Sequence, residues 1–134
     1  MGAWGTGIFE DDAALDFVAE VTAAGDAAAV EEALRVAAEE AYLDADLAAR
    51  ALVAASVVAA LADGGGELPD DLRGWVAARK APTGDVMRQA QSAVLRVLRE
   101  SELRDLWAES DELDAWCAGL QGLAERLERR QERA

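Results

Sequence analysis

Residues 46–62 of the chain read DLAARALVAASVVAALA, and this stretch decides the fold. No residue from Ala51 to Ala62 is charged, and apolar side chains fall on nearly every side of a helix built from them. This run is well short of the roughly 20 residues that a membrane-spanning helix needs. We therefore predict a helix at the centre of the core of a water-soluble protein, and this helix is ended by the glycines at 64–66.

Two further helices are predicted on the N-terminal side of this stretch. Apolar residues recur at spacings of three and four over residues 12–23, and Gly25 ends that helix. A second pattern of the same kind follows, up to a corner at residues 42–46. The expected buried positions are Ala14, Leu15, Val18 and Val21 in the first helix, and Val30, Ala33, Leu34 and Ala37 in the second.

Residues 67–134 carry the same helical periodicity. Pro69 opens a short helix, a longer one follows residues 82–85, and Ser101 caps a short segment. The last helix has a seam like that of a coiled coil, made of Leu113, Trp116, Leu120, Leu123 and Leu127. Strand-like alternation is absent from the sequence, so we predict an all-α, compact, single-domain bundle of five to seven helices spanning residues 1–134.

The two ends of the chain differ from this pattern. Residues 1–9 are rich in glycine but contain Trp4, Ile8 and Phe9, which are costly to leave in water. We expect an irregular strap packed against the helices. Residues 125–134 are mostly charged, and we expect them to form a helix end that frays.

Negative charge is concentrated in the first half of the chain. The formal net charge is −14, and residues 1–66 hold thirteen acidic residues against Arg35 and Arg50. Between Arg73 and Arg99, six basic residues face Asp85 alone. Two arrangements are open: this arginine-rich segment neutralises the acidic helices internally, or the acids stay in water and attract a cationic partner. Direct nucleic-acid binding is disfavoured, because it requires a cationic surface.

The inventory of reactive side chains is poor. Histidine is absent, so the side chain best suited to proton transfer near neutral pH is missing. Cys117 is the single cysteine, so no internal disulfide can form, which favours the cytoplasm. The sequence favours a protein without catalysis, a cofactor or a membrane anchor.

The N-terminal sequence MGAWGTGIFEDD, residues 1–12, followed by ALDF at 14–17, resembles the bacterial family called domain of unknown function 4259. SELRDLW at 101–107 is similar in kind. Many relatives have Asn and Trp where this chain has Asp11 or Asp12 and Phe17. The resemblance implies a bacterial, helical, stand-alone protein and no particular activity.

Carboxylates offer two kinds of candidate site. A calcium or magnesium ion would suit the glycine-containing loop with Asp63, Glu67, Asp70 and Asp71, although the spacing does not match an EF-hand. A second cation candidate joins the acids of residues 12–20 to Asp44 and Asp46. The candidate partner-binding acids are Asp12, Asp16, Glu20, Glu31 and Glu32.

These observations give two functional hypotheses. The first is a non-enzymatic acidic module that docks on a basic macromolecule, as an immunity-type inhibitor of a toxin or a mimic of nucleic-acid charge. The alternative is a carboxylate-rich helical protein that binds a divalent cation. We expect a monomer, or a weak homodimer formed through the seam of the last helix.

Overall fold

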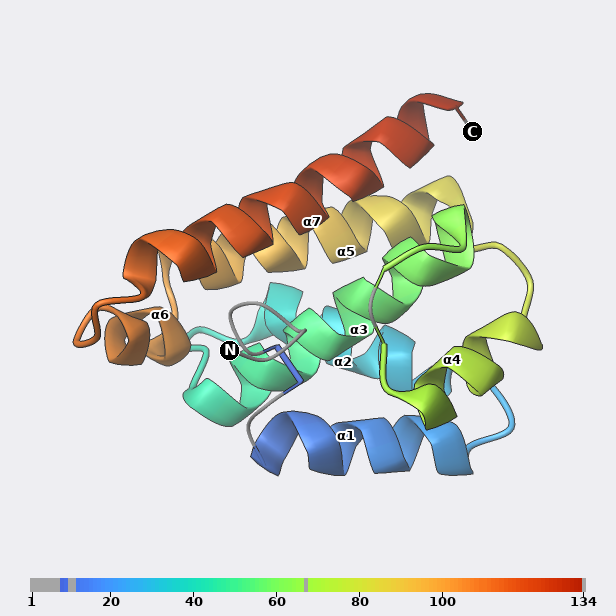
Figure 1. Ribbon diagram of the computed structural model, residues 1–134, viewed down its shortest axis with the longest axis horizontal. Helices are drawn as coiled ribbons and strands as arrows, with labels where there is room; N and C mark the ends of the chain where they lie inside the picture. Colours follow the sequence, from blue (N-terminus) through green and yellow to red (C-terminus); the bar gives the residue numbers. More distant parts are fainter. Residues whose placement is uncertain (1–7, 10–11, 67, 134) are drawn as a thin grey trace.

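The computed structural model of the chain describes residues 8–9, 12–66 and 68–133. Seven helices and no strands make up this part of the chain, which confirms the prediction of an all-α bundle (Figure 1). The helices are α1 (Asp12–Ala23), α2 (Ala28–Glu39), α3 (Ala45–Asp63), α4 (Asp70–Ala77), α5 (Gly84–Arg99), α6 (Glu102–Trp107) and α7 (Leu113–Arg133).

The predicted central helix is α3, which contacts all six of the other helices. The Asp44 carboxylate caps its N-terminus by accepting a hydrogen bond from Leu47 N at 2.8 Å. Gly64 ends it in the left-handed conformation, with φ of 72°. By length and composition α3 could cross a membrane, but 67% of its 18-residue apolar stretch is buried inside the protein, as in the core helix of a soluble domain.

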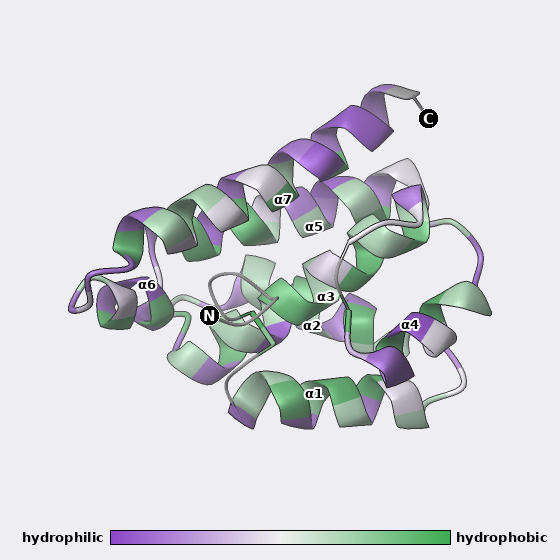
Figure 2. Cartoon of the chain, viewed as in Figure 1, coloured by the Kyte–Doolittle hydropathy of each residue, from purple (hydrophilic) through white to green (hydrophobic). Residues whose placement is uncertain are grey.

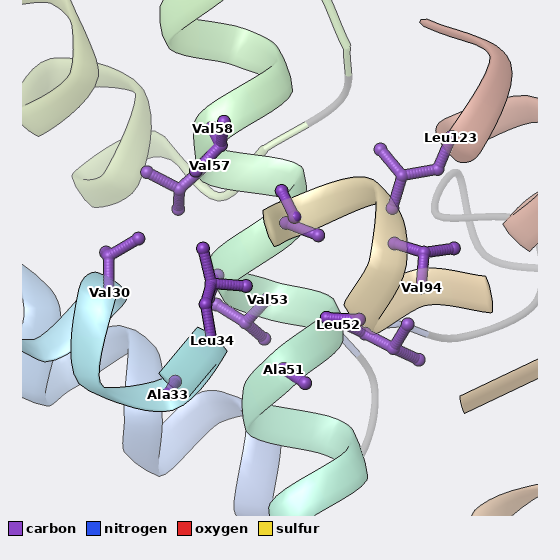
Figure 3. Packing of buried hydrophobic residues seen from close by; sticks show 14 of the residues in the cluster. Val30, Ala33, Leu34, Ala51, Leu52, Val53, Val57, Val58, Val94 and Leu123 are labelled. Carbon is purple, nitrogen blue, oxygen red and sulfur yellow. The ribbon is translucent and has the colours of Figure 1, made fainter. Parts of the chain in front are cut away.

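Small side chains let the other helices approach α3 closely. Every residue from Ala51 to Ala60 is buried, and five of these ten are alanines. Valine and leucine side chains of α2 reach α3 from one side, and those of α5 and α7 reach it from the other (Figure 3). Alanine adds little volume of its own, so the bulk of the core comes from these neighbours.

The last helix lies along α5, on the side of the molecule opposite α1 (Figure 1). Four members of its predicted seam are buried, and Leu113 is half-buried. Because the seam packs inside the domain, it offers little apolar surface to a second copy of the chain. Residues 125–133 continue the helix and are mostly hydrophilic (Figure 2), and Gln131 Nε2 donates to Gln91 Oε1 at 2.7 Å.

One predicted core position of α1 was wrong. Leu15 is 45% exposed, whereas Phe17 is buried at 3%. The buried stripe is Ala14, Phe17, Val18 and Val21, which follows the three–four spacing from Ala14. Leu15 lies about 100° around the helix from Ala14 and so reaches the solvent side.

Two residues of the predicted N-terminal strap are described. Phe9 is a member of the core at 6% exposure, and Ile8 packs partly buried against it. The rest of the strap, residues 1–7, lies outside the described residues.

Candidate acidic docking surface

The outer face of α1 carries three carboxylates one turn apart. Asp12, Asp16 and Glu20 are all exposed, and within the described ranges no arginine or lysine forms an ion pair with Asp12 or Asp16. Glu20 has a loose partner, because its Oε2 lies 3.8 Å from Arg50 Nη2. Leu15 is on the same solvent side, so an apolar side chain borders the carboxylates.

The acids of α2 are only partly neutralised. Arg35 donates from Nε to Glu32 Oε1 at 3.0 Å and from Nη1 to Glu39 Oε1 at 2.6 Å, and its Nη2 bonds the second oxygen of Glu32. These hydrogen bonds lower the pKa of Glu32 below its usual value. Glu31 is exposed and has no ion pair among the residues described. One arginine therefore serves two carboxylates, and a surplus of negative charge remains.

A groove of about 170 Å³ lies between α1 and α2, and residues of α3 complete its lining. Glu20 and Glu32 both line it, together with Arg50 of α3. The Arg50 guanidinium lies 5.7 Å from the centroid of the Phe17 ring, which also lines the groove. The apolar lining is completed by Ala29, Ala33, Val36 and Leu47. The structure thus brings two of the five predicted partner-binding acids together, while Asp12, Asp16 and Glu31 lie outside the groove.

The arginine-rich segment does not neutralise these acids. Arg96 donates to the carbonyl oxygens of Ala37 at 2.6 Å and Ala41 at 3.2 Å, at the end of α2. Arg79 stacks on Trp75, 4.2 Å from its ring centroid, and donates to a carbonyl just after α1. Both guanidinium groups therefore compensate the negative C-terminal ends of helices rather than carboxylates.

Other arginines of this segment pair within their own helices. Arg88 bonds Asp85, and Arg73 Nη1 lies 3.3 Å from Asp70 Oδ1. Across the parts of the chain that the structure describes, the Arg50–Glu20 contact is the one ion pair that reaches the acids of α1 and α2 from another helix. The acids of α1 and α2 are therefore largely left to solvent.

Asp63, from the predicted cation loop, binds a side chain instead. Arg126 donates from Nε to Oδ2 at 3.0 Å and from Nη2 to Oδ1 at 2.9 Å, and Gly65 N donates to Oδ1 at 2.8 Å. Partial burial raises the pKa of Asp63, but the hydrogen bonds from Arg126 and Gly65 outweigh it, so the pKa is lowered. The guanidinium also lies against Gly66, where a Cβ would come within 3.0 Å of Arg126 Nη1.

The remaining cation candidates are not gathered around Asp63. Asp70 pairs with Arg73, Asp71 is exposed on α4, and Glu67 lies outside the described residues. Asp44 caps α3, and Asp46 is exposed in its first turn. Within the described residues no three carboxylate or cysteine side chains could hold one metal ion together. The divalent-cation alternative stays a prediction.

A model of the family described as Domain of unknown function (DUF4259) matches residues 2–119. The chain belongs to this family. The match confirms the resemblance seen in the sequence, while residues 1–7 and 10–11 of the N-terminal motif lie outside the described structure. No curated protein and no solved structure matches the chain. The DUF4259 match ends within α7, so Arg126 and its bond to Asp63 lie beyond the matched region.

Proposed function

We propose that this DUF4259 protein is a non-enzymatic docking module of the bacterial cytoplasm, whose acidic surface on α1 and α2 binds a basic macromolecular partner. An immunity-type inhibitor of a basic toxin and a mimic of nucleic-acid charge are both forms of this function. The observation that supports it is the lack of internal compensation. Asp12, Asp16 and Glu31 are exposed and have no ion pair with any residue that the structure describes, although the chain contains arginines that a different packing could have directed toward them.

Electrostatics supports the proposal because the carboxylates repel one another. Like charges four residues apart on a helix cost a few tenths of a kcal/mol each, and Asp12, Asp16 and Glu20 make two such pairs. A basic partner removes this repulsion on binding. It would also be steered toward the surface, with association rates that fall as salt is added.

Leu15 supplies an apolar contact within the charged surface. Its side chain is 45% exposed beside the carboxylates of α1. Charge at an interface chiefly gives specificity and a fast association rate, while affinity comes from a few well-buried contacts. We expect Leu15 to become buried when the partner binds.

The test is capture of a partner from bacterial lysate at low salt, with two triple charge reversals. The first variant, D12K/D16K/E20K, removes the acidic face of α1. The second, D114K/E125K/E128K, makes the same change in net charge on exposed positions of α7, and Asp114 lies in the first helical turn as Asp12 does.

The first variant should lose the captured partner, and the second should retain most of it. Circular dichroism of both variants checks that their helices persist. Equal capture by the two variants would mean that net charge alone attracts proteins, and a wild-type chain that captures nothing would remove the proposal.

A further inference from the structure

The groove between α1 and α2 combines apolar walls with two carboxylates. The groove is lined by Phe17, by small side chains such as Ala29 and Ala33, and by Glu20 and Glu32. The carboxylate side chains are 56% and 58% exposed, so they are accessible to a ligand from solvent. A long side chain with an apolar stem and a cationic end fits such a lining.

We propose that this groove is a subsite for one arginine side chain of the basic partner. This inference rests on the proposed function, and it commits to the stem lying against the apolar walls and the guanidinium meeting Glu20. The groove volume of about 170 Å³ is on the scale of one long side chain. Arginine is favoured over lysine because its planar group can bind a carboxylate through two N–H groups.

The protein's own Arg50 already shows this chemistry. Its guanidinium lies 5.7 Å from the centroid of the Phe17 ring and 3.8 Å from Glu20 Oε2. The distance to Glu20 exceeds that of a direct hydrogen bond, so both oxygens of Glu20 can still accept hydrogen bonds. Arg50 therefore competes weakly for the position that a partner's arginine would take.

The charge around the groove also favours a cation. Glu32 is held by Arg35, which is shared with Glu39, and Arg50 adds one further positive charge. Asp16 lies one turn before Glu20, and Glu31 precedes Glu32 in the sequence. Both are exposed, and neither forms an ion pair within residues 8–9, 12–66 and 68–133. Carboxylates therefore outnumber guanidinium groups around the groove.

The experiment is a titration of the isotopically labelled full chain, followed by NMR, with N-acetyl-arginine amide as the probe. N-acetyl-citrulline amide is the matched control ligand, because it has nearly the same shape without the charge. We expect millimolar arginine amide to shift resonances of Phe17, Ala33 and Leu47, with at least about tenfold weaker binding of citrulline amide and weaker binding of lysine amide. No shifts around the groove, or equal shifts from citrulline, would overturn the proposal.

Variants separate the groove from the general attraction of charge. A29L fills the groove and leaves every charge in place, while A38L makes the same change at an exposed position about two and a half turns along α2, on its opposite side. A29L should abolish the arginine shifts and A38L should keep them. R50M should tighten arginine binding several-fold, because it removes the internal competitor; an unchanged affinity in A29L would overturn the proposal.

A decalysine peptide tests the proposed function apart from this subsite. Its salt-dependent binding should fall in D12K/D16K/E20K and persist in A29L. A wild-type chain that does not bind decalysine would count against the docking surface. A wild-type chain that binds decalysine but does not prefer arginine amide to citrulline amide would count against the groove alone.

Discussion

Arg126 connects the last helix to the end of the central one through both oxygens of Asp63. The two side chains are 25% and 23% exposed, so water screens this pair less than a surface pair. We predict that D63N and R126Q each lower the free energy of unfolding by about 1 kcal/mol at pH 7. Urea unfolding of both single variants and the double variant measures the coupling between the residues.

Arg88 provides the control for this pair. It bonds Asp85 within one helix turn, but the two side chains are 61% and 78% exposed. R88Q should therefore change stability by no more than about 0.5 kcal/mol. If R126Q is as mild as R88Q, the link between α7 and the end of α3 contributes nothing.

The same pair predicts a pH dependence of stability. The pKa of Asp63 is lowered from its ordinary value of 3.8, so the unfolded chain binds the proton more tightly than the folded chain does. The stabilisation by its carboxylate is thus complete above pH 3.8 and is lost as the pH falls through the lowered value. We predict that wild type and D63N differ in their free energy of unfolding at pH 7, and that this difference becomes smaller below pH 3.8. Urea unfolding at a series of pH values from 7 to below 3.8 measures it.

Charge counts predicted which residues are candidates for the docking surface, but not their partners. The count left open whether arginines such as Arg96 would pair with carboxylates of the first helices. Arg96 instead binds two backbone carbonyl groups, and every segment of the sequence contains such groups. Tertiary packing determines which of them face an arginine, so the sequence could not settle the question. Likewise, no local pattern indicated that Glu20 and Glu32 would share a groove with Arg50.

At the scale of the element, α3 leaves no room for larger side chains. Ala54 is fully buried at 0% exposure in a helix that contacts every other helix. We predict that A54L lowers the free energy of unfolding by about 1–3 kcal/mol, because the added atoms must displace neighbouring helices. A118L, at an exposed position of α7, should change it by less than about 0.5 kcal/mol in the same urea titration. Equal stability of the two variants would contradict the tight packing of α3.

Helix ends were predictable where one side chain determines them. Gly64 ends α3 with a positive φ, and the hydroxyl of Ser101 accepts a hydrogen bond from Arg104 N at the start of α6. The faces of short helices were harder to predict. In α1, both Leu15 and Phe17 are compatible with an apolar stripe, and contact with α3 decides between them.

This difference within α1 gives a prediction about stability. Val21 is at 0% exposure, so V21A should lower the free energy of unfolding by about 2 kcal/mol. L15A should change it by less than about 0.5 kcal/mol, because nearly half of that side chain is already in water. Thermal unfolding of V21A and L15A measures both changes. A large loss of stability in L15A would mean that Leu15 belongs to the core rather than to the docking surface.

The charge of the whole molecule opposes its compact state. The formal net charge is −14, and the arginines that bind carbonyl groups or their own helices leave the acids of α1 and α2 close together. Raising NaCl from 10 to 150 mM shortens the Debye length from about 30 to about 8 Å, which screens this repulsion. The same salt also weakens attractive surface pairs such as Arg35–Glu32, but those pairs contribute little when exposed.

We therefore predict that stability rises with NaCl over this range, on the order of 1 kcal/mol, since each like-charged pair one turn apart costs about 0.2–0.5 kcal/mol. In D12K/D16K/E20K, which carries less repulsion, the rise in stability with salt should be smaller. The rise in D114K/E125K/E128K should lie between that of D12K/D16K/E20K and that of the wild type. Urea unfolding at each salt concentration measures the effect. A wild-type stability that falls with salt would mean that attraction within the molecule outweighs repulsion, and the acids of the first helices would then be compensated internally rather than available to a partner.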